Sequence, residues 1–113
     1  MVGKEIEGYE NYLIYPDGRV WSKHRNKFMK QQIVRGYYYV GLCKNNKVNL
    51  FRVHRLVAKA FIPNPDNLPE INHKDENCFN NCVENLEWCT NHYNQNYGTH
   101  QQRSARSRGI PVV

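Results

Sequence analysis

The sequence predicts an α+β fold, in which an N-terminal antiparallel sheet and one helix precede a strand–loop–strand–helix unit. Three observations predict it. Turn signals at residues 16–18 and 45–46 separate short apolar runs, as in β-hairpins. One later segment has apolar residues at helical spacing. A second short helix signal follows two brief apolar runs that enclose an Asn-rich loop.

The first hairpin is expected at residues 9–22. An apolar run at residues 12–15 leads into Pro16-Asp17-Gly18, whose residue types favour a tight turn, and the chain then returns. The following stretch, residues 24–32, is rich in basic residues and has no clear period. We therefore expect it to be irregular.

The second hairpin is expected at residues 36–52. Residues 36–43 alternate between two faces, with Tyr38, Val40 and Leu42 on the apolar face. Residues 48–52 return after the turn. The two hairpins together predict the N-terminal antiparallel sheet.

A compact amphipathic helix should follow from residue 53 to residue 61. Its apolar stripe consists of Val53, Leu56, Val57, Ala60 and Phe61. Pro63 and Pro65 stop the helix, because proline has no N–H to donate.

The strand–loop–strand–helix unit is expected in the last part of the chain. Residues 70–73 form a strand that ends in a histidine, and residues 86–89 form the second strand. Thr90 is a suitable N-cap for a helix that runs to about residue 97. Such a unit brings the helix back across the first strand, so that Asn72, His73 and Asn94 converge.

Composition favours an anionic partner and an intracellular protein. The 113 residues carry a net charge of +6 with a pI near 9.3, and nucleic acid is the first partner to consider. No apolar run could cross a membrane, and the polar N-terminus is unlike a secretory signal, so we expect a cytoplasmic protein. The four cysteines are then expected as thiols, and a zinc site of Cys78 and Cys82 with His73 or His92 is the less favoured alternative.

The converging group suits phosphodiester cleavage. A neutral histidine can take a proton from an attacking water near neutral pH. The amide oxygens of Asn72 and Asn94 can hold Mg²⁺ or Mn²⁺, with phosphate oxygens completing the ligand set. Zinc is not the expected metal.

The runs VHRLVAKAF and INHKDENCFNNCVENLEWCTNHYNQN resemble the HNH homing-endonuclease family, which includes phage and intron-encoded nicking enzymes. The run EIEGYENYLIYPDGRVWS resembles the N-terminal module that often precedes HNH in those proteins. Together they cover roughly residues 5 to 97. The resemblance implies a ββα-metal unit and a phage or bacterial protein.

The resemblance also implies roles for individual residues. His73 matches the general base, and Asn85 matches the central Asn, which fixes the loop and helps to orient the base. Asn94 and Asn72 match metal ligands, although Asp or His is more common in place of Asn72. A neutral ligand implies weak metal affinity until DNA phosphate arrives, so Asn72→Asp is expected to strengthen metal binding.

Domain boundaries and DNA contacts are expected as follows. Residues 1–50 form a DNA-contacting β module, residues 51–100 the nuclease unit, and residues 101–113 a basic, mobile tail. A two-stranded ribbon fits a major groove. The expected DNA-binding residues are basic or aromatic: Arg25, Lys27, Arg35, Tyr37, Tyr39, Lys44, Lys47 and Lys74.

The sequence therefore predicts a metal-dependent endonuclease acting on double-stranded DNA, as a monomer or a homodimer. One catalytic centre cuts one strand, so a monomer is expected to nick. Two alternatives stay open. The chain could be a catalytically decayed DNA-binding module on the same scaffold, which the neutral side chain of Asn72 favours. It could also be a zinc-stabilised nucleic-acid adaptor.

Overall fold

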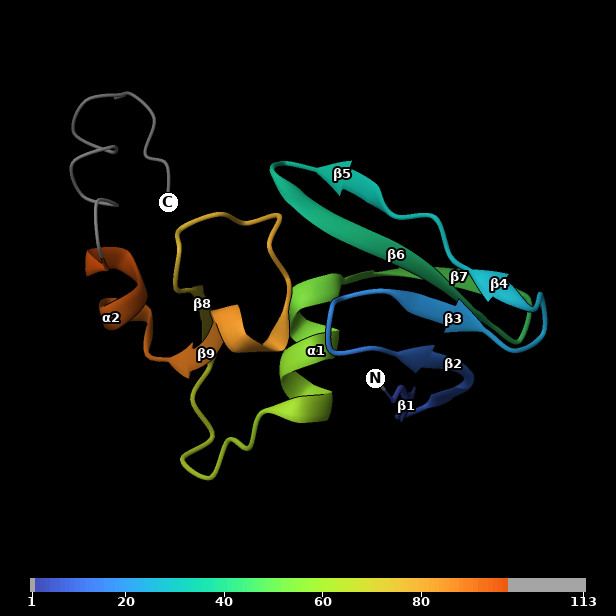
Figure 1. The fold of residues 1–113 in the computed structure, drawn as a ribbon, viewed down its shortest axis with the longest axis horizontal. Helices are drawn as coiled ribbons and strands as arrows, with labels where there is room; N and C mark the ends of the chain where they lie inside the picture. Colours follow the sequence, from blue (N-terminus) through green and yellow to red (C-terminus); the bar gives the residue numbers. More distant parts are fainter. Residues whose placement is uncertain (1, 98–113) are drawn as a thin grey trace.

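The computed structural model describes residues 2–97, and its first sheet contains the predicted first hairpin (Figure 1). Four antiparallel strands lie in the order β1 (Lys4–Ile6), β2 (Tyr9–Ile14), β3 (Val20–Ser22) and β4 (Lys27–Phe28). The turn between β2 and β3 is closed by Gly18 N donating to Tyr15 O at 2.9 Å. Gly18 has φ +93°, a conformation that glycine adopts without a side-chain clash. The turn prediction is thereby confirmed.

The second sheet contains the predicted second hairpin. Its strands are β5 (Gln32–Val34), β6 (Tyr37–Lys44) and β7 (Lys47–Arg52), all antiparallel. Asn45 and Asn46 have φ of 54° and 64°, as a two-residue turn between right-twisted strands requires.

The prediction that residues 24–32 are irregular is wrong in part. The short strand β4 pairs with β3, where Trp21 lies opposite Phe28, and β5 begins at Gln32. Strand β1, which pairs with β2, lies before the predicted hairpin and was not expected. These short edge strands exist because a neighbouring strand offers backbone hydrogen bonds, and that pairing leaves no period in the sequence.

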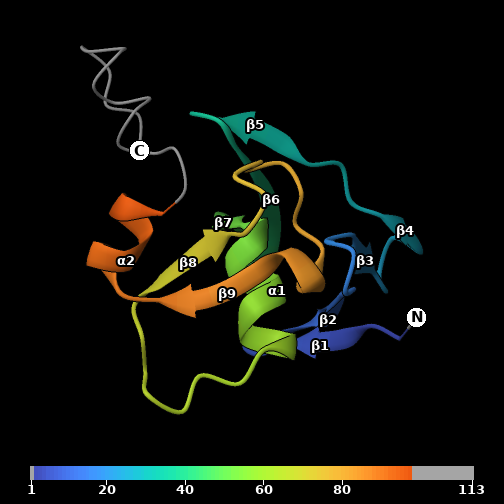
Figure 2. The same ribbon diagram turned by 60° about the vertical axis from the view of Figure 1, so that its left-hand side comes forward.

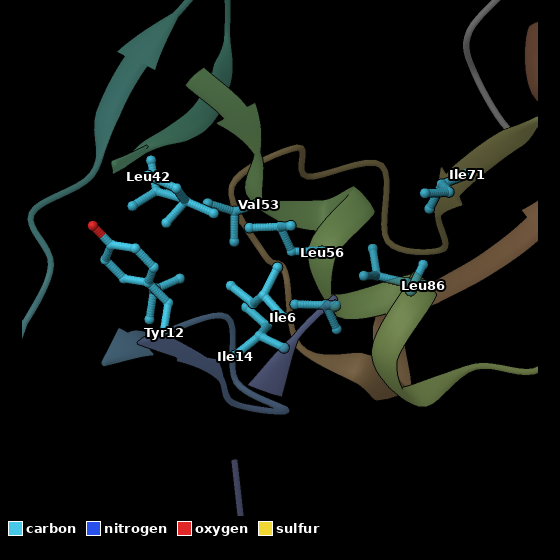
Figure 3. Packing of buried hydrophobic residues seen from close by; sticks show 12 residues of the cluster. Ile6, Tyr12, Ile14, Leu42, Val53, Leu56, Ile71 and Leu86 are labelled. Carbon is cyan, nitrogen blue, oxygen red and sulfur yellow. The ribbon is translucent and has the colours of Figure 1, made fainter. Parts of the chain in front are cut away.

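Helix α1 (Val53–Phe61) lies between the two N-terminal sheets and the rest of the described chain, as Figure 1 shows. Its residues Val53, Leu56, Val57 and Ala58 are buried, and the helix ends where Ile62 N donates to Ala58 O at 3.0 Å. Figure 3 shows side chains of both sheets on one side of α1 and side chains of the β8–β9 hairpin on the other. They belong to one hydrophobic cluster, whose labelled members include Ile6, Tyr12, Ile14, Leu42, Ile71 and Leu86.

The last unit has the predicted order of strand, loop, strand and helix (Figure 2). Strand β8 (Glu70–His73) pairs antiparallel with β9 (Leu86–Cys89), and the 3₁₀ turn η1 (Val83–Asn85) precedes β9. Helix α2 (Asn91–Asn96) begins after Thr90, whose hydroxyl accepts a hydrogen bond from Tyr93 N at 3.0 Å. The predicted N-cap is confirmed.

The first hairpin also contacts the loop between β8 and β9. Val83 N donates to Pro16 O at 2.8 Å, and a Cβ at Gly18 would lie 3.2 Å from Asn81 Cβ. The loop of the last unit is therefore supported by the N-terminal sheet. The expected tail at residues 101–113 lies outside the described residues, and within residues 2–97 no helix is long and apolar enough to cross a membrane.

Candidate active site

Three of the four predicted catalytic and metal-binding residues line one cavity, between β8, the β8–β9 loop and α2. The cavity has a volume of about 280 Å³, and Asn72, His73 and Asn94 are all in its wall. The other lining residues are Tyr37, Glu70, Ile71, Glu76, Cys78, Asn91 and Gln95. Antiparallel pairing of β8 with β9 places the start of α2 beside β8, and this brings Asn94 to the same cavity as the histidine.

His73 is the last residue of β8 and is only 6% exposed. Its Nε2 lies 2.9 Å from Asn81 Oδ1. An amide oxygen can only accept a hydrogen bond, so Nε2 carries the ring proton and Nδ1 bears a lone pair, to which no group within residues 2–97 donates. Burial lowers the pKa of His73, against opposing effects of the Asn81 hydrogen bond and the Asp75 carboxylate. His73 is therefore neutral near pH 7 and able to accept a proton.

A second histidine, His54, packs against the ring of His73. His54 of α1 is buried, its ring lies 5.1 Å from that of His73, and it stacks on Tyr37 at 5.5 Å with an angle of 23°. Burial lowers the pKa of His54 to about 3, with further lowering by His73, Arg52 and Arg55. His54 is thus a neutral aromatic support for His73.

Asn85 holds the loop rather than lining the cavity. Its Oδ1 accepts from Asp75 N at 3.0 Å, and its Nδ2 donates to Asp75 Oδ1 and Asn80 O, both at 2.9 Å. The amide groups of Asn80 and Asn85 and the backbone N–H of Asn77 hold the pKa of Asp75 below its usual value. Asn85 therefore fixes the loop that presents Asn81 to His73.

Asn72 of β8 is 1% exposed; it lines the cavity and contacts Glu87 of β9. Its Nδ2 donates to Glu87 Oε2 at 2.8 Å. Among residues 2–97, no donor reaches its Oδ1. A buried oxygen without a hydrogen-bond partner needs a ligand or water to satisfy it. Together with the amide of half-buried Asn94, it fits the hard oxygen ligands that Mg²⁺ and Mn²⁺ prefer.

The described part of the chain contains no group of three or more His, Cys, Asp or Glu side chains placed to hold a metal. Cys78 and Cys82 are partly exposed thiols, and His92 lies exposed on α2. The oxygen atoms that the cavity wall offers to a cation include the amides of Asn72 and Asn94, and the carboxylates of Glu70 and Glu76 also line it.

The residues predicted to bind DNA lie in separate places. Lys44 and Lys47 flank the β6–β7 turn, Arg25 and Lys27 border a groove at β3 and β4, and Lys74 is exposed next to His73. Arg35 is exposed in the β5–β6 turn.

The two predicted DNA-binding tyrosines have partners within the protein. Tyr37 lines the cavity and stacks on His54, and burial raises the pKa of its hydroxyl. Tyr39 Oη accepts a hydrogen bond from Arg52 Nε at 2.8 Å. Tyr37 therefore helps to build the cavity wall, whereas Tyr39 is held by Arg52.

Sequence reasoning did not assign site roles to Asn81 or Glu87. Both contact a predicted site residue through a side-chain hydrogen bond from another element. Glu87 could be found only once the antiparallel register was known, because that register pairs Asn72 with position 87 and places both side chains on one face. For Asn81 no periodic signal exists, because it lies in an irregular loop.

Comparison with known proteins identifies relatives over most of the chain. Residues 2–43 match the NUMOD4 motif. The DNA endonuclease I-HmuI of Bacillus phage SP01 is 41% identical over 96 residues, which cover 83% of this chain and 55% of that protein. An uncharacterized HNH endonuclease of Acanthamoeba polyphaga mimivirus is 48% identical over 89 residues, 78% of this chain and 27% of the relative.

A solved structure shows the same fold. A structure of DNA binding and cleavage by the HNH homing endonuclease I-HmuI superposes on this chain with a TM-score of 0.79 at 37% identity. The match covers 100% of this chain and 62% of that one. The chain therefore spans only part of the length of the relatives that it matches.

Proposed function

Because this chain is related to the HNH homing endonucleases over most of its length, we propose that it hydrolyses phosphodiester bonds in double-stranded DNA with a divalent cation. The observation that carries the proposal is the cavity wall, where neutral His73 lies beside the amides of Asn72 and Asn94. A proton acceptor and oxygen donors in one cavity are the two requirements of metal-assisted hydrolysis.

In this proposal His73 is the general base. Its Nδ1 accepts a proton from the water that attacks phosphorus, while Nε2–H stays on Asn81 Oδ1 and keeps the ring in place. As the new P–O bond forms, the bond to the 3′ oxygen breaks. The Asp75 carboxylate and the Asn81 hydrogen bond favour the charged imidazole that results. Bound Mg²⁺ or Mn²⁺ would supply charge neutralisation at the phosphate and at the leaving oxygen.

Asn72 and Asn94 would hold the cation, and Asn85 would act at a distance by fixing the loop. One such cavity can cut one strand, so a monomer would nick DNA. A break in both strands would need a homodimer or two successive events.

Exposed basic residues of the N-terminal module would hold the duplex. Lys44 and Lys47 lie at the turn end of the β6–β7 hairpin, and Lys74 adds positive charge next to the cavity. Contacts of lysine with phosphate release counterions, so DNA affinity should fall steeply as salt rises.

One observation favours a second function. Asn72 is neutral where a charged ligand is more usual, so the chain could bind DNA without cutting it. The two functions differ in one readout, because only the first converts supercoiled plasmid to the open circular form.

A plasmid-nicking assay with Mg²⁺, Mn²⁺ or EDTA tests the proposal. We expect nicking with either cation and none with EDTA. His73→Ala should abolish nicking and leave DNA retention in a gel-shift assay nearly unchanged, while the control His92→Ala, at an exposed histidine of α2, should nick normally. Intact supercoiled plasmid in every metal, together with DNA binding, would establish the second function instead.

A further inference from the structure

Glu87 lies beside the candidate cation ligand Asn72 on the neighbouring strand. The two residues are opposite each other in the β8–β9 pair, and Asn72 Nδ2 donates to Glu87 Oε2 at 2.8 Å. Asn72 lines the cavity, whereas Glu87 is not among the lining residues. Asn72 therefore borders the cavity and also contacts a carboxylate that is not among the lining residues.

This contact determines which atom of Asn72 faces the cavity. A carboxylate can only accept hydrogen bonds, so the atom that it meets must be the NH₂ group. The oxygen is then the polar atom left for the cavity, and no donor within residues 2–97 occupies it. With the opposite amide orientation, the Asn72 oxygen would face the Glu87 carboxylate oxygen, and the NH₂ group of Asn72 would repel a cation.

The same carboxylate oxygen also connects β8 and β9 to α2. Tyr93 Oη donates to Glu87 Oε2 at 3.2 Å, and Tyr93 N donates to the hydroxyl of the N-cap Thr90 at 3.0 Å. Asn94, the other candidate ligand, is the next residue of α2. Glu87 is thus hydrogen-bonded to one ligand and to the neighbour of the other.

We propose that Glu87 is a positioning residue for the cation site, one that directs the Asn72 oxygen into the cavity and supplies the negative charge that this neutral ligand lacks. The inference rests on the function proposed above. A hydrogen bond from an amide N–H to a carboxylate polarises the amide and makes the amide oxygen a stronger ligand for a cation. The Asn72–Glu87 pair therefore replaces a single aspartate.

This pairing changes the expectation for Asn72→Asp. The new carboxylate would lie against Glu87, and two carboxylates at hydrogen-bond distance cannot both stay ionised. We now expect Asn72→Asp alone to weaken cation binding. The double variant Asn72→Asp/Glu87→Gln should reverse the loss, because the new amide at position 87 can donate its NH₂ to the new carboxylate.

Two measurements with Mn²⁺ test the proposal. The first is binding of Mn²⁺ to the protein, followed by electron paramagnetic resonance of the free ion. The second is the Mn²⁺ concentration for half-maximal plasmid nicking, recorded separately from the rate at saturating Mn²⁺. For Glu87→Ala we expect that concentration to rise about 10- to 100-fold, with a smaller change in the saturated rate.

The variants include a matched control. Glu87→Gln keeps an oxygen for Tyr93 and Asn72 but loses the charge, so it should fall between wild type and Glu87→Ala. Glu84→Gln removes the same charge from an exposed position three residues away and should behave as wild type. Thermal melting of each variant shows whether it is folded under the assay conditions.

The outcomes separate this inference from the proposed function. If wild type nicks and Glu87→Ala needs no more Mn²⁺, Glu87 has no part in the site and this inference alone fails. It fails equally if Asn72→Asp binds Mn²⁺ more tightly than the double variant. A wild-type chain that neither nicks DNA nor binds Mn²⁺ overturns the proposed function and this inference together.

Discussion

Mild acid should destabilise this protein through His54, and His54→Phe should remove that part of the effect. His54 is 7% exposed, and burial together with His73, Arg52 and Arg55 lowers its pKa to about 3 from an ordinary 6.5. Between those pH values the unfolded chain binds a proton at His54 that the folded chain does not. The stability that neutral His54 contributes is therefore complete above about pH 6.5 and is lost as pH falls toward about 3.

The magnitude follows from the distance to the unfolded pKa. At pH 5, about 1.5 pH units below that pKa, the loss is about 2 kcal/mol at roughly 1.4 kcal/mol per unit. The loss of stability at pH 5 is nearly the same for any folded-state pKa well below 5. It therefore depends on the burial of His54 and hardly on how far below 5 that pKa lies. Phe keeps an aromatic ring against Tyr37 but cannot titrate.

Urea unfolding at about pH 7.5 and about pH 5 measures the effect for wild type and His54→Phe. Wild type should lose about 2 kcal/mol more than the variant between the two pH values, whatever the variant's absolute stability. His24→Gln, at an exposed histidine, is the control and should lose as much as wild type. Equal losses in wild type and His54→Phe would refute the reasoning.

Three further substitutions test contacts that connect the elements. Gly18→Ala should cost about 1–2 kcal/mol of stability and slow nicking, because position 18 has φ +93° and the new Cβ would press on Asn81 Cβ at 3.2 Å. Unfolding and nicking assays check it, and an unchanged nicking rate would show that the loop absorbs the strain. Asn85→Ala should cost about 2–3 kcal/mol in urea unfolding, since it removes three hydrogen bonds and leaves the backbone N–H of Asp75 without its acceptor. Tyr12→Phe should cost about 1 kcal/mol in the same assay, because the hydroxyl of this buried tyrosine accepts from a backbone N–H of β6 at 3.0 Å; a neutral result would mean that water replaces the hydroxyl.

The candidate site was predictable where it depends on local pattern. His73 at a strand end, the N-cap Thr90 and Asn94 on the next helix all follow from short-range signals, and the structure brings His73, Asn94 and Asn72 to one cavity. The loop-fixing position of Asn85 also agrees with expectation.

The supporting contacts were not predictable in the same way. Asn81 lies within an irregular loop, and nothing in its spacing shows that its oxygen meets a histidine ring. Likewise, the packing of Tyr37 against His54 requires β6 to lie against α1, whereas the alternating pattern of β6 only assigned Tyr37 to a face. A period in the sequence reports which side of an element a residue occupies, and it does not report what lies on that side.

The sequence by itself determined the two hairpins, helix α1 and the strand–loop–strand–helix unit, because turn residues, apolar periods and caps act within a few positions of the chain. Only the tertiary structure decided the edge strands β1, β4 and β5, the partner of each site residue and the pairing of Asn72 with Glu87. Those features arise when separate elements satisfy each other's hydrogen bonds and exclude water, and that depends on their packing in space.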